Sequence, residues 1–576
     1  MPSQPISLKS CRKTFTTDQD KARRPEETLA NFYSQIDKLP IKIVHEVRRI
    51  DNGRLGIPVY FSVCGDDAQA LTGTKKQMGK GASPAQAEAS ACMELAERFS
   101  LFSFAGQAGN FLAGDYESLR DYPLLPAEQL LKSAGDTRLS GSQLQEILHG
   151  IPLQWAWATE LVSGKPLLVP FSWFFAINEF NGSSAGNTLE EAALQAICEV
   201  VERHVSSLVS QKRLAAPMID RQSLTDPVAR ELLQKFARAG VDLQLYDFSL
   251  DTGVATVAAV GIDKTTFPTT SEIVYTAGTS PDPQKAVIRA ITEVAQLAGD
   301  FNTGANYVAS GLPKPAALAD IAYLGGQVKK SIHDLPNLAD DDILVEIQRI
   351  VAAMARIGLS VFLLDATHRQ LAIPAVYAIV PGAHFRERAS HGDAGLFAAK
   401  IAMDLLDDDA FAEKLAVMER LLPENAYLPF YRGQRAMNAG DLERAVGHFT
   451  QALEAGAADE QIATICSYAG NCLNGMGRYR EAVDLFRRGL AADEERPDIH
   501  NGLGVAWYKL ADYAQAIGHF GRAVELNPAS AIDYANLGVN HARLGQREAA
   551  KNFLRLALTL DPGLDFARRE LAALEE

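Results

Sequence analysis

The sequence predicts a mixed α+β domain followed by an all-α solenoid of helix–turn–helix repeats. Up to about residue 400, strand-like segments such as PVYFSVC and GVATVAAVGID alternate with long helical patterns, including Pro84–Phe104, Thr188–Gln211 and Pro283–Gly299. Beyond about residue 425 the pattern is helical throughout and repeats. An acidic stretch, MDLLDDDAFAEK, marks the change near residues 403–414. We therefore expect a first domain over 1–405 and a repeat domain over 425–576.

Composition restricts the class of protein. The 576 residues are too many for one ordinary core, and 47% apolar with 22% charged residues is typical of globular proteins. The net charge of −15, without any Lys/Arg-rich run, argues against nucleic acid as a partner. Six cysteines without a C-x-x-C pair fit a reducing compartment. No signal peptide or long apolar run is visible, so we expect a cytoplasmic protein that does not enter a membrane.

The C-terminal segments NAGDLERAVGHF, GMGRYREAVDLF, KLADYAQAIGHF and RLGQREAAKNFL align with one another. They end at Phe449, Phe486, Phe520 and Leu554, with spacings of 37, 34 and 34 residues. A 34-residue helix–turn–helix period is typical of tetratricopeptide repeats. One such repeat cannot bury its own apolar face, so about four copies should stack into a solenoid with a concave surface.

Three of the predicted helices each carry a polar face at helical spacing. The faces consist of Ser90, Glu94, Glu97 and Arg98; of Glu191, Glu199, Glu202 and Arg203; and of Arg289, Glu293 and Gln296. Salt-bridge patterning on a solvated surface is the plain alternative for any one of them. Alanine-rich flanks, a glycine-containing loop before each helix and the threefold occurrence favour a shared site instead.

Such a site has a definite chemistry. Its five glutamates, Glu94, Glu97, Glu199, Glu202 and Glu293, could not stay ionised together without cations, because unpaired buried charge is costly. Magnesium takes carboxylate and phosphate oxygens, and glycine-containing loops at helix starts bind anions. The residues therefore predict a Mg–nucleotide site. It is not a P-loop, because GTKKQMGKG has the wrong spacing and no Ser/Thr after Lys80.

The motifs S-x3-E-x2-E-R, E-x-x-E-R and R-x3-E-x2-Q, in this order, resemble the ATP-binding motifs of the YcaO family. RRPEETL and NGSSAGNTLEEA resemble further signatures of that family, and the resemblance covers roughly residues 5–400. It implies a YcaO-type domain with ATP and Mg²⁺ as cofactors. It also implies nucleotide contacts from Lys13, Ser90, Arg98, Ser184, Asn187, Glu191, Arg203, Arg289 and Gln296, and magnesium ligation by Glu94, Glu97, Glu199, Glu202 and Glu293.

The sequence departs from the family at two places. The usual Gly-x-His-Arg after the lysine is replaced by DQDK, Asp18 to Lys21. The chain ends RRELAALEE instead of the Pro-rich tail of azoline-forming members, which makes azoline formation the less favoured expectation.

The resemblance implies ATP-dependent phosphorylation of a peptide-backbone amide oxygen. The expected outcome is a thioamide, amidine or azoline, or support of ribosomal-protein β-methylthiolation. The alternatives are a non-catalytic ATP-binding scaffold that recruits a modifying enzyme through its repeats, and an interaction protein with an inactive nucleotide fold. Expected partners are a peptide or protein client, and a sulfur donor, a modifying enzyme or a second copy of the chain. The sequence names neither the client nor the nucleophile.

Three further features have an ordinary structural interpretation. His204 follows the second E-x-x-E-R, and we expect it to be packed or solvated rather than a proton shuttle. Cys92 and Cys198 lie within the acidic helices and suit packing better than nucleophilic chemistry. The aromatic segment FSWFFAINEF, residues 171–180, has strand-like spacing and is expected in the core.

Overall fold

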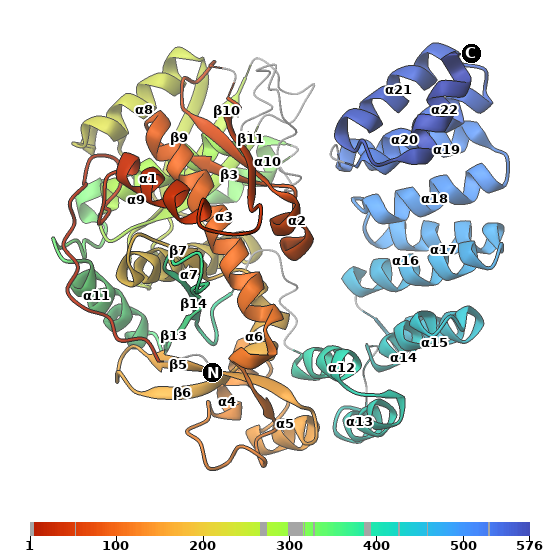
Figure 1. Ribbon diagram of the computed structural model, residues 1–576, viewed down its shortest axis with the longest axis horizontal. Helices are drawn as coiled ribbons and strands as arrows, with labels where there is room; N and C mark the ends of the chain where they lie inside the picture. The colour runs from red at the N-terminus through yellow and green to blue at the C-terminus, as the bar shows by residue number, and fades with distance from the viewer. Residues whose placement is uncertain are drawn as a thin grey trace. The chain divides into compact units, whose positions relative to one another are not determined.

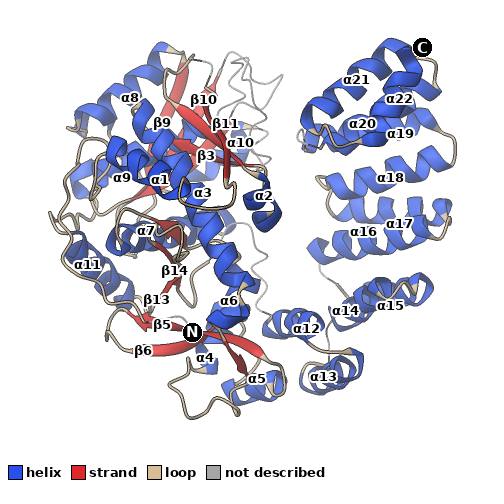
Figure 2. Ribbon diagram, in the orientation of Figure 1, coloured by secondary structure: helices blue, strands red, loops and turns tan. Residues whose placement is uncertain are grey.

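The computed structural model describes residues 5–51, 53–264, 273–297, 315, 317–325, 329–384, 393–423, 425, 427–457, 459–527 and 530–575. The chain divides into two compact units, Met1–Phe397 and Ala398–Glu576 (Figure 1). The predicted domain limits, 405 and 425, stay a prediction. The strands of all three sheets lie in the first unit, whereas the second unit is drawn in helices (Figure 2).

The first sheet has three antiparallel strands in the order β1-β2-β3. They are β1 (Val44–Arg49), β2 (Val59–Cys64) and β3 (Lys76–Lys80). Helix α3 (Pro84–Gly106) packs on this sheet, and Ser62 Oγ donates to the Ala91 carbonyl oxygen at 2.8 Å. A Cβ at Gly79 would overlap the backbone of Ala87 and Ala91. Glycine at 79 therefore lets β3 lie directly on α3.

The second sheet repeats this arrangement. Its order is β11 (Ile273–Thr279), β10 (Thr256–Asp263), β9 (Val241–Asp247), β8 (Met218–Ile219) and β12 (Lys329–Lys330). Helix α9 (Pro283–Leu297) packs on β11, and Thr276 Oγ1 donates to the Ala290 carbonyl oxygen at 2.8 Å. A Cβ at Gly278 would overlap the backbone of Ala286 and Ala290. Helix α8 (Pro227–Arg238) packs beside α9 over the same apolar core.

The third sheet carries the remaining acidic helix. Its order is β4 (Leu112–Gly114), β5 (Leu153–Glu160), β13 (Phe362–Asp365), β14 (Ala375–Ile379) and β7 (Ser183–Ala185), with β6 (Pro166–Pro170) paired to β5. Helix α7 (Leu189–Gln211) follows β7 and packs on β14, and α11 (Ile343–Arg356) packs against α7. The other helices of the unit are α1 (Pro25–Ile36), α2 (Asp66–Thr72), α4 (Ala127–Ala134), α5 (Gly141–Leu148), α6 (Phe171–Asn178) and α10 (Leu318–Ile321).

Residues 171–178 of the aromatic segment form helix α6, so the strand suggested by its spacing is wrong. Phe171, Trp173 and Phe174 are each at most 2% exposed, as expected for a core segment. Six of the eight residues of α6 are apolar, so its sequence shows no polar face from which a helical period can be read.

The second unit contains the predicted repeats, and Figure 1 shows its helices from α14 to α22 as a stack. Its helices are α12 (Ala394–Leu405), which begins in the first unit, α13 (Asp408–Leu421), α14 (Tyr427–Asn438), α15 (Leu442–Glu454), α16 (Asp459–Gly475), α17 (Tyr479–Ala492), α18 (Pro497–Lys509), α19 (Tyr513–Leu526), α20 (Ala531–Arg543), α21 (Arg547–Leu560) and α22 (Asp565–Glu575). From α14 to α21 they pair as four successive hairpins.

A glycine in the first helix of each hairpin lies against a large side chain of the second helix. The pairs are Gly433 with Phe449, Gly470 with Phe486, Gly504 with Phe520, and Gly538 with Leu554. This recurring contact explains the sequence period, because only glycine lets the two helices approach so closely. The prediction of a mixed α+β domain followed by helical repeats is confirmed. Within the described residues, no helix is both long and apolar enough to span a membrane.

We expect Gly504→Ala to destabilise the repeats. The new Cβ would lie 2.7 Å from ring carbons of Phe520, and overpacking of this kind costs about 1–3 kcal/mol. The matched control is Gly518→Ala on the exposed side of α19, where no atom lies within 4 Å of the new Cβ. Denaturant unfolding monitored by circular dichroism should show a lower midpoint for Gly504→Ala and an unchanged or higher one for the control. Equal midpoints would contradict the packing explanation.

Candidate functional site

Three strand–loop–helix segments of the first unit share one register. Helices α3, α7 and α9 begin at Pro84, Leu189 and Pro283, after strands β3, β7 and β11. The equivalent positions six, ten and thirteen residues beyond these starts are Ser90, Gln195 and Arg289; Glu94, Glu199 and Glu293; and Glu97, Glu202 and Gln296. The same polar face is therefore built three times.

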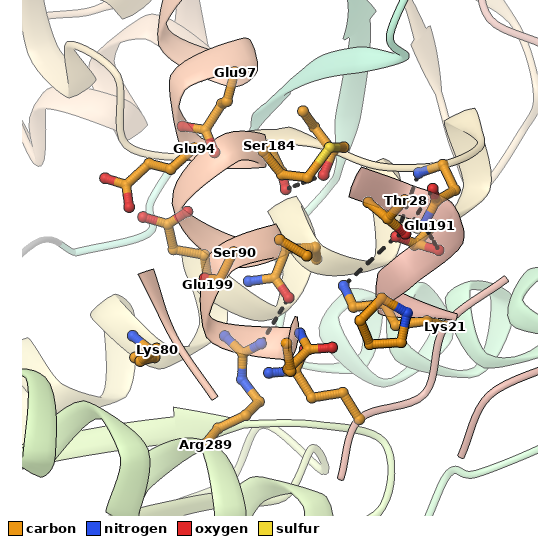
Figure 3. A pocket seen from close by; sticks show the side chains of 18 of the residues that line it. Lys21, Thr28, Lys80, Ser90, Glu94, Glu97, Ser184, Glu191, Glu199 and Arg289 are labelled. Atoms are coloured by element: carbon orange, nitrogen blue, oxygen red, sulfur yellow. Dashed lines mark hydrogen bonds and ion pairs between the residues drawn. The ribbon is translucent and has the colours of Figure 1, made fainter. Parts of the chain in front are cut away.

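The three faces line a single pocket (Figure 3). Thirteen of the fourteen residues predicted for the site lie in its wall: Ser90, Glu94, Glu97, Arg98, Ser184, Asn187, Glu191, Glu199, Glu202, Arg203, Arg289, Glu293 and Gln296. Figure 3 shows Glu94, Glu97 and Glu199 with Lys80 at one side, and Lys21, Thr28 and Glu191 at the other.

Each glutamate that lies ten residues beyond a helix start is paired with one cation. The pairs are Glu94 with Arg98 at 3.6 Å, Glu199 with Arg203 at 2.9 Å, and Glu293 with Lys80. In the first two pairs the arginine follows four residues later on the same helix. Helix α9 has Leu297 at that place. The cation for the third glutamate therefore comes from the end of strand β3.

The two remaining carboxylates are held by hydroxyl and backbone donors as well as by arginines. Glu97 Oε1 accepts from Arg98 at 2.7 Å and from Ser183 Oγ at 2.6 Å. Glu202 Oε2 accepts from the backbone N–H of Thr279 at 2.9 Å, with Arg289 3.7 Å away. Both carboxylates are thus fixed by the loops and strands that precede the acidic helices.

Burial makes this concentration of negative charge unfavourable. It raises the pKa of Glu94, Glu97 and Glu202, and the neighbouring Glu199 acts in the same direction, whereas the arginines oppose the rise. Burial also lowers the pKa of Lys80 to about 8. A divalent cation among these carboxylates would favour their ionised form.

The donor set fits magnesium in particular. Among the residues that the structure describes, no group of three or more acidic, histidine or cysteine side chains is close enough to hold a metal by itself. Magnesium usually binds through one or two carboxylates together with water and substrate phosphates, not in a cage made only of protein. The carboxylates of α3, α7 and α9 are suited to a metal that enters with a phosphate ligand.

The other side of the pocket is formed by the N-terminal segment and the start of α7. Glu191 accepts from Asn187 Nδ2 at 3.1 Å and from the backbone N–H of Ala22 at 2.9 Å, and Lys21 Nζ lies 3.6 Å away. Ser184 on β7 is 3% exposed. This side offers a lysine, an amide and a hydroxyl to a ligand.

Lys13 is the one predicted site residue outside the pocket wall. Its Nζ lies 2.7 Å from Asp20 Oδ2 and 2.5 Å from Glu346 Oε1, and its side chain is 5% exposed. Its predicted phosphate contact therefore stays a prediction. Lys21, in the DQDK segment that departs from the family pattern, is the N-terminal lysine that lines the pocket.

Sequence reasoning missed eleven of the residues that line the pocket wall, among them Lys21, Lys80 and Gln195. Gln195 could have been found from its place four residues before Glu199, equivalent to Ser90 and Arg289, and it accepts from Arg289 Nη1 at 2.6 Å. The sequence signal for Lys80 was weaker: the residue lies in GKG, residues 79–81, shortly before the start of α3. Nothing local in the sequence indicates the position of Lys21.

The histidine and cysteines near the acidic motifs are packed. His204 is 7% exposed and accepts from the backbone N–H of His384 at 3.0 Å, and burial lowers its pKa to about 4. Cys92 and Cys198 are buried, and burial raises the pKa of both thiols to about 12. None of the three lines the main pocket.

Comparisons with known proteins agree with this architecture. The YcaO cyclodehydratase family, described as binding ATP and Mg²⁺, matches residues 78–384, and two tetratricopeptide-repeat families match 475–531 and 534–564. A solved heterocyclase in complex with substrate and cofactor has the same fold, with a TM-score of 0.55 and 24% identity over 66% of this chain and 55% of that chain.

Two relatives show the extent of the similarity. An uncharacterised protein of Methanothermobacter thermautotrophicus is 30% identical over 63% of this chain and 94% of its own length. The ribosomal protein S12 methylthiotransferase accessory factor YcaO of Escherichia coli is 26% identical over 50% of each chain, so the present chain spans only half of that relative. Because the family match covers more than half of its residues and includes the pocket-lining motifs, this chain belongs to the YcaO family of ATP- and Mg²⁺-binding proteins.

Proposed function

We propose that this protein uses ATP and Mg²⁺ to activate a peptide-backbone amide by phosphorylating its oxygen. The modified product is a thioamide, an amidine or an azoline, or the activity supports β-methylthiolation of a ribosomal protein. The observation that carries the proposal is the single pocket in which three acidic helix faces converge with arginines and lysines. The S12 accessory-factor name of the Escherichia coli relative is the support for the last of these outcomes.

The pocket residues divide into two chemical roles. Glu94, Glu199 and Glu293 are anionic and share the register of the three helices, so with Glu97 and Glu202 they would hold magnesium. Arg98, Arg203 and Arg289 would balance the phosphate charge, and Gln195 orients Arg289 through its side-chain oxygen. A positioned set of cations and oxygen ligands is most of what phosphoryl transfer requires from a protein.

The chemistry supplied by bound Mg–ATP is phosphorylation of the amide oxygen after a nucleophile has added to the carbonyl carbon, which turns that oxygen into a leaving group. The chain's residues then have to exclude water, because hydrolysis competes with transfer. Glu97, Ser184 and Glu191 are each at most 9% exposed and form the sheltered part of the wall.

A second candidate function rests on the repeats. The protein would bind ATP without modifying the client itself and would recruit a modifying enzyme, a sulfur donor or a second copy of the chain through the solenoid. Two observations favour it: the four stacked hairpins, whose architecture commonly binds peptides or proteins, and the name of the Escherichia coli relative, an accessory factor.

The two candidates separate in one experiment. The purified full chain is incubated with Mg–ATP and candidate client peptides, and ADP release and peptide mass are followed together. Peptide-dependent ADP release with loss of water, or with exchange of oxygen for sulfur or nitrogen, supports the enzyme. The scaffold is supported if the protein binds nucleotide but leaves the peptide mass unchanged, and if the same clients are modified once a partner enzyme is added.

We expect Glu94→Gln and Glu202→Gln each to abolish Mg-dependent ATP binding while leaving the fold intact. Each substitution removes a negative charge and one oxygen ligand but keeps the side-chain size. Titration calorimetry with Mg²⁺, and again with a chelator, measures the effect, and circular dichroism checks the fold. The control is Glu231→Gln on α8, whose side chain is 64% exposed. Wild-type affinity in either pocket variant would remove the metal assignment.

Arg289→Ala should weaken ATP binding about tenfold, because a charge-assisted hydrogen bond is worth about 1.5–3 kcal/mol. Arg289 lies in the pocket wall and contacts Gln195 and Glu202. The matched control, Arg238→Ala, removes an exposed arginine near the end of α8. Calorimetry of the two variants gives the comparison, and equal affinities would mean that the third motif is only structural.

A chain ending at Leu421 should keep Mg–ATP binding, because every predicted site residue lies before residue 300. It should lose client recruitment or self-association, which the repeats are proposed to provide. Calorimetry measures the first property, and client processing rate together with light scattering measures the second. A soluble truncated protein that binds ATP and processes its client at the full-length rate would exclude the recruitment role, and loss of ATP binding would favour a purely stabilising one.

A further inference from the structure

The N-terminal segment, residues 5–24, crosses the starts of two helices before it reaches α1. At α7, the backbone N–H of Lys9 donates to Glu190 Oε1 at 2.8 Å. At α11, the backbone N–H of Cys11 donates to Asp342 Oδ1 at 2.9 Å. Carboxylates at these two helix starts thus bind the segment through its backbone, and Ser10 Oγ also donates to Asp342 Oδ2 at 2.5 Å.

Beyond Cys11 the segment folds into a turn that enters the pocket wall. The turn is closed by the backbone hydrogen bonds Lys21 N–H to Phe15 O at 2.8 Å and Thr14 N–H to Lys21 O at 3.0 Å. Gln19, within the turn, and Lys21, which closes it, line the pocket. The position of this turn therefore decides where two of the pocket's polar side chains stand.

One buried ion-pair network attaches the turn to helix α11. Lys13 Nζ joins Asp20 Oδ2, on the turn, to Glu346 Oε1, on α11, at 2.7 and 2.5 Å. The side chains of Lys13 and Glu346 are 5% and 0% exposed, so water cannot replace either partner. The backbone N–H of Asp340 also donates to Glu346 Oε1, at 3.1 Å, and ties the carboxylate to the loop before the helix.

Glu346 makes none of the contacts expected of a ligand-binding group. It is absent from the pocket wall. Its second oxygen, Oε2, is buried without a hydrogen-bond partner in the described part of the chain. A buried carboxylate kept under these conditions needs a compensating cation, and Lys13 is the one that it contacts. Lys13 thus pairs with Glu346 on α11 and with Asp20, and it does not line the pocket.

We propose that Lys13 and Glu346 are positioning residues: their ion pair, shared with Asp20, holds the 14–21 turn so that Lys21 faces the phosphates of the nucleotide. This inference rests on the proposed nucleotide-binding function. It assigns the direct contact to Lys21, adjacent to Asp20, and gives Lys13 an indirect role through the turn. Any change that releases Asp20 from α11 shifts Lys21 with it, because the two residues are neighbours in the chain.

The test compares four variants of the full-length protein in two measurements. Hydrogen exchange of peptides covering residues 10–24 is measured without nucleotide, and Mg–ATP affinity is measured by calorimetry. The variants are Glu346→Gln, Lys13→Met, Lys21→Met and the control Gln348→Ala, an exposed position on the same helix.

We expect Glu346→Gln and Lys13→Met to behave alike. Both should speed exchange in the turn and weaken Mg–ATP binding about tenfold, the usual effect of removing a residue that supports a ligand-binding group. Lys21→Met should weaken binding to a similar degree while exchange in the turn stays at the wild-type rate. Gln348→Ala should change neither quantity.

Two results would overturn the proposal. One is loss of binding in Lys13→Met with unchanged binding in Glu346→Gln, because Lys13 would then contact the nucleotide itself. The other is wild-type exchange in both variants, because the ion pair would then not hold the turn. If wild-type protein fails to bind ATP, the proposed function falls, but the exchange measurement still decides whether the ion pair positions the turn.

A global loss of protection in either single variant is resolved by the double variant Lys13→Met/Glu346→Leu. It removes both charges together, and replacing a buried ion pair by apolar side chains is often neutral for stability. Faster exchange confined to the turn, with weaker Mg–ATP binding, then supports the proposal. Wild-type exchange and affinity in the double variant would refute it.

Discussion

Mutual repulsion among carboxylates in one partly buried pocket is the constraint that shapes the first unit. Helices α3, α7 and α9 bring five glutamates together, and burial raises the pKa of Glu94, Glu97 and Glu202. Each of the three equivalent glutamates is paired with its own cation. For Glu94 and Glu199 the cation lies on the glutamate's own helix, and for Glu293 it lies on strand β3. A magnesium–nucleotide complex would bring a cation for the carboxylates and phosphates for the arginines. The carboxylates and arginines that pair with each other here would then bind the magnesium and the phosphates instead. Their present pairing orders the pocket residues before a ligand enters.

Close packing between strand and helix places α3 and α9 in equivalent positions beside the pocket. Gly79 on β3 and Gly278 on β11 lie directly on alanines of α3 and α9, where a Cβ would overlap the helix backbone. The short strand-to-helix loops then start both helices at the same distance from the sheet, so equivalent residues face the same space. Strands β3 and β11 thus pack directly on the alanines of these helices. The same alanines distinguish the helices from solvated, salt-bridged ones.

The repeats obey a different physical rule. Each hairpin buries its glycine against a large side chain of the same repeat, and polar contacts join neighbouring repeats, such as Ser467 with Asp498 at 2.6 Å. Because each repeat packs mainly on its neighbours, the unit's stability is a sum of local terms. The partner proposed above would bind on the exposed faces of these repeats.

The sequence by itself determined the features that recur at a fixed spacing along the chain. The acidic faces follow from the 3.6-residue helical period and the repeats from the 34-residue period, so eleven pocket residues and four hairpins could be predicted from spacing alone. Ser184 and Asn187 were predicted only through the resemblance to the YcaO family. The tertiary structure decided what depends on distant partners. Lys80 pairs with a glutamate more than two hundred residues away, Lys13 pairs with Glu346 and does not line the pocket, and residues 171–178 form a helix packed into the core. Charge pairing and burial act through space, and no spacing along the chain encodes which of several lysines will reach a given carboxylate.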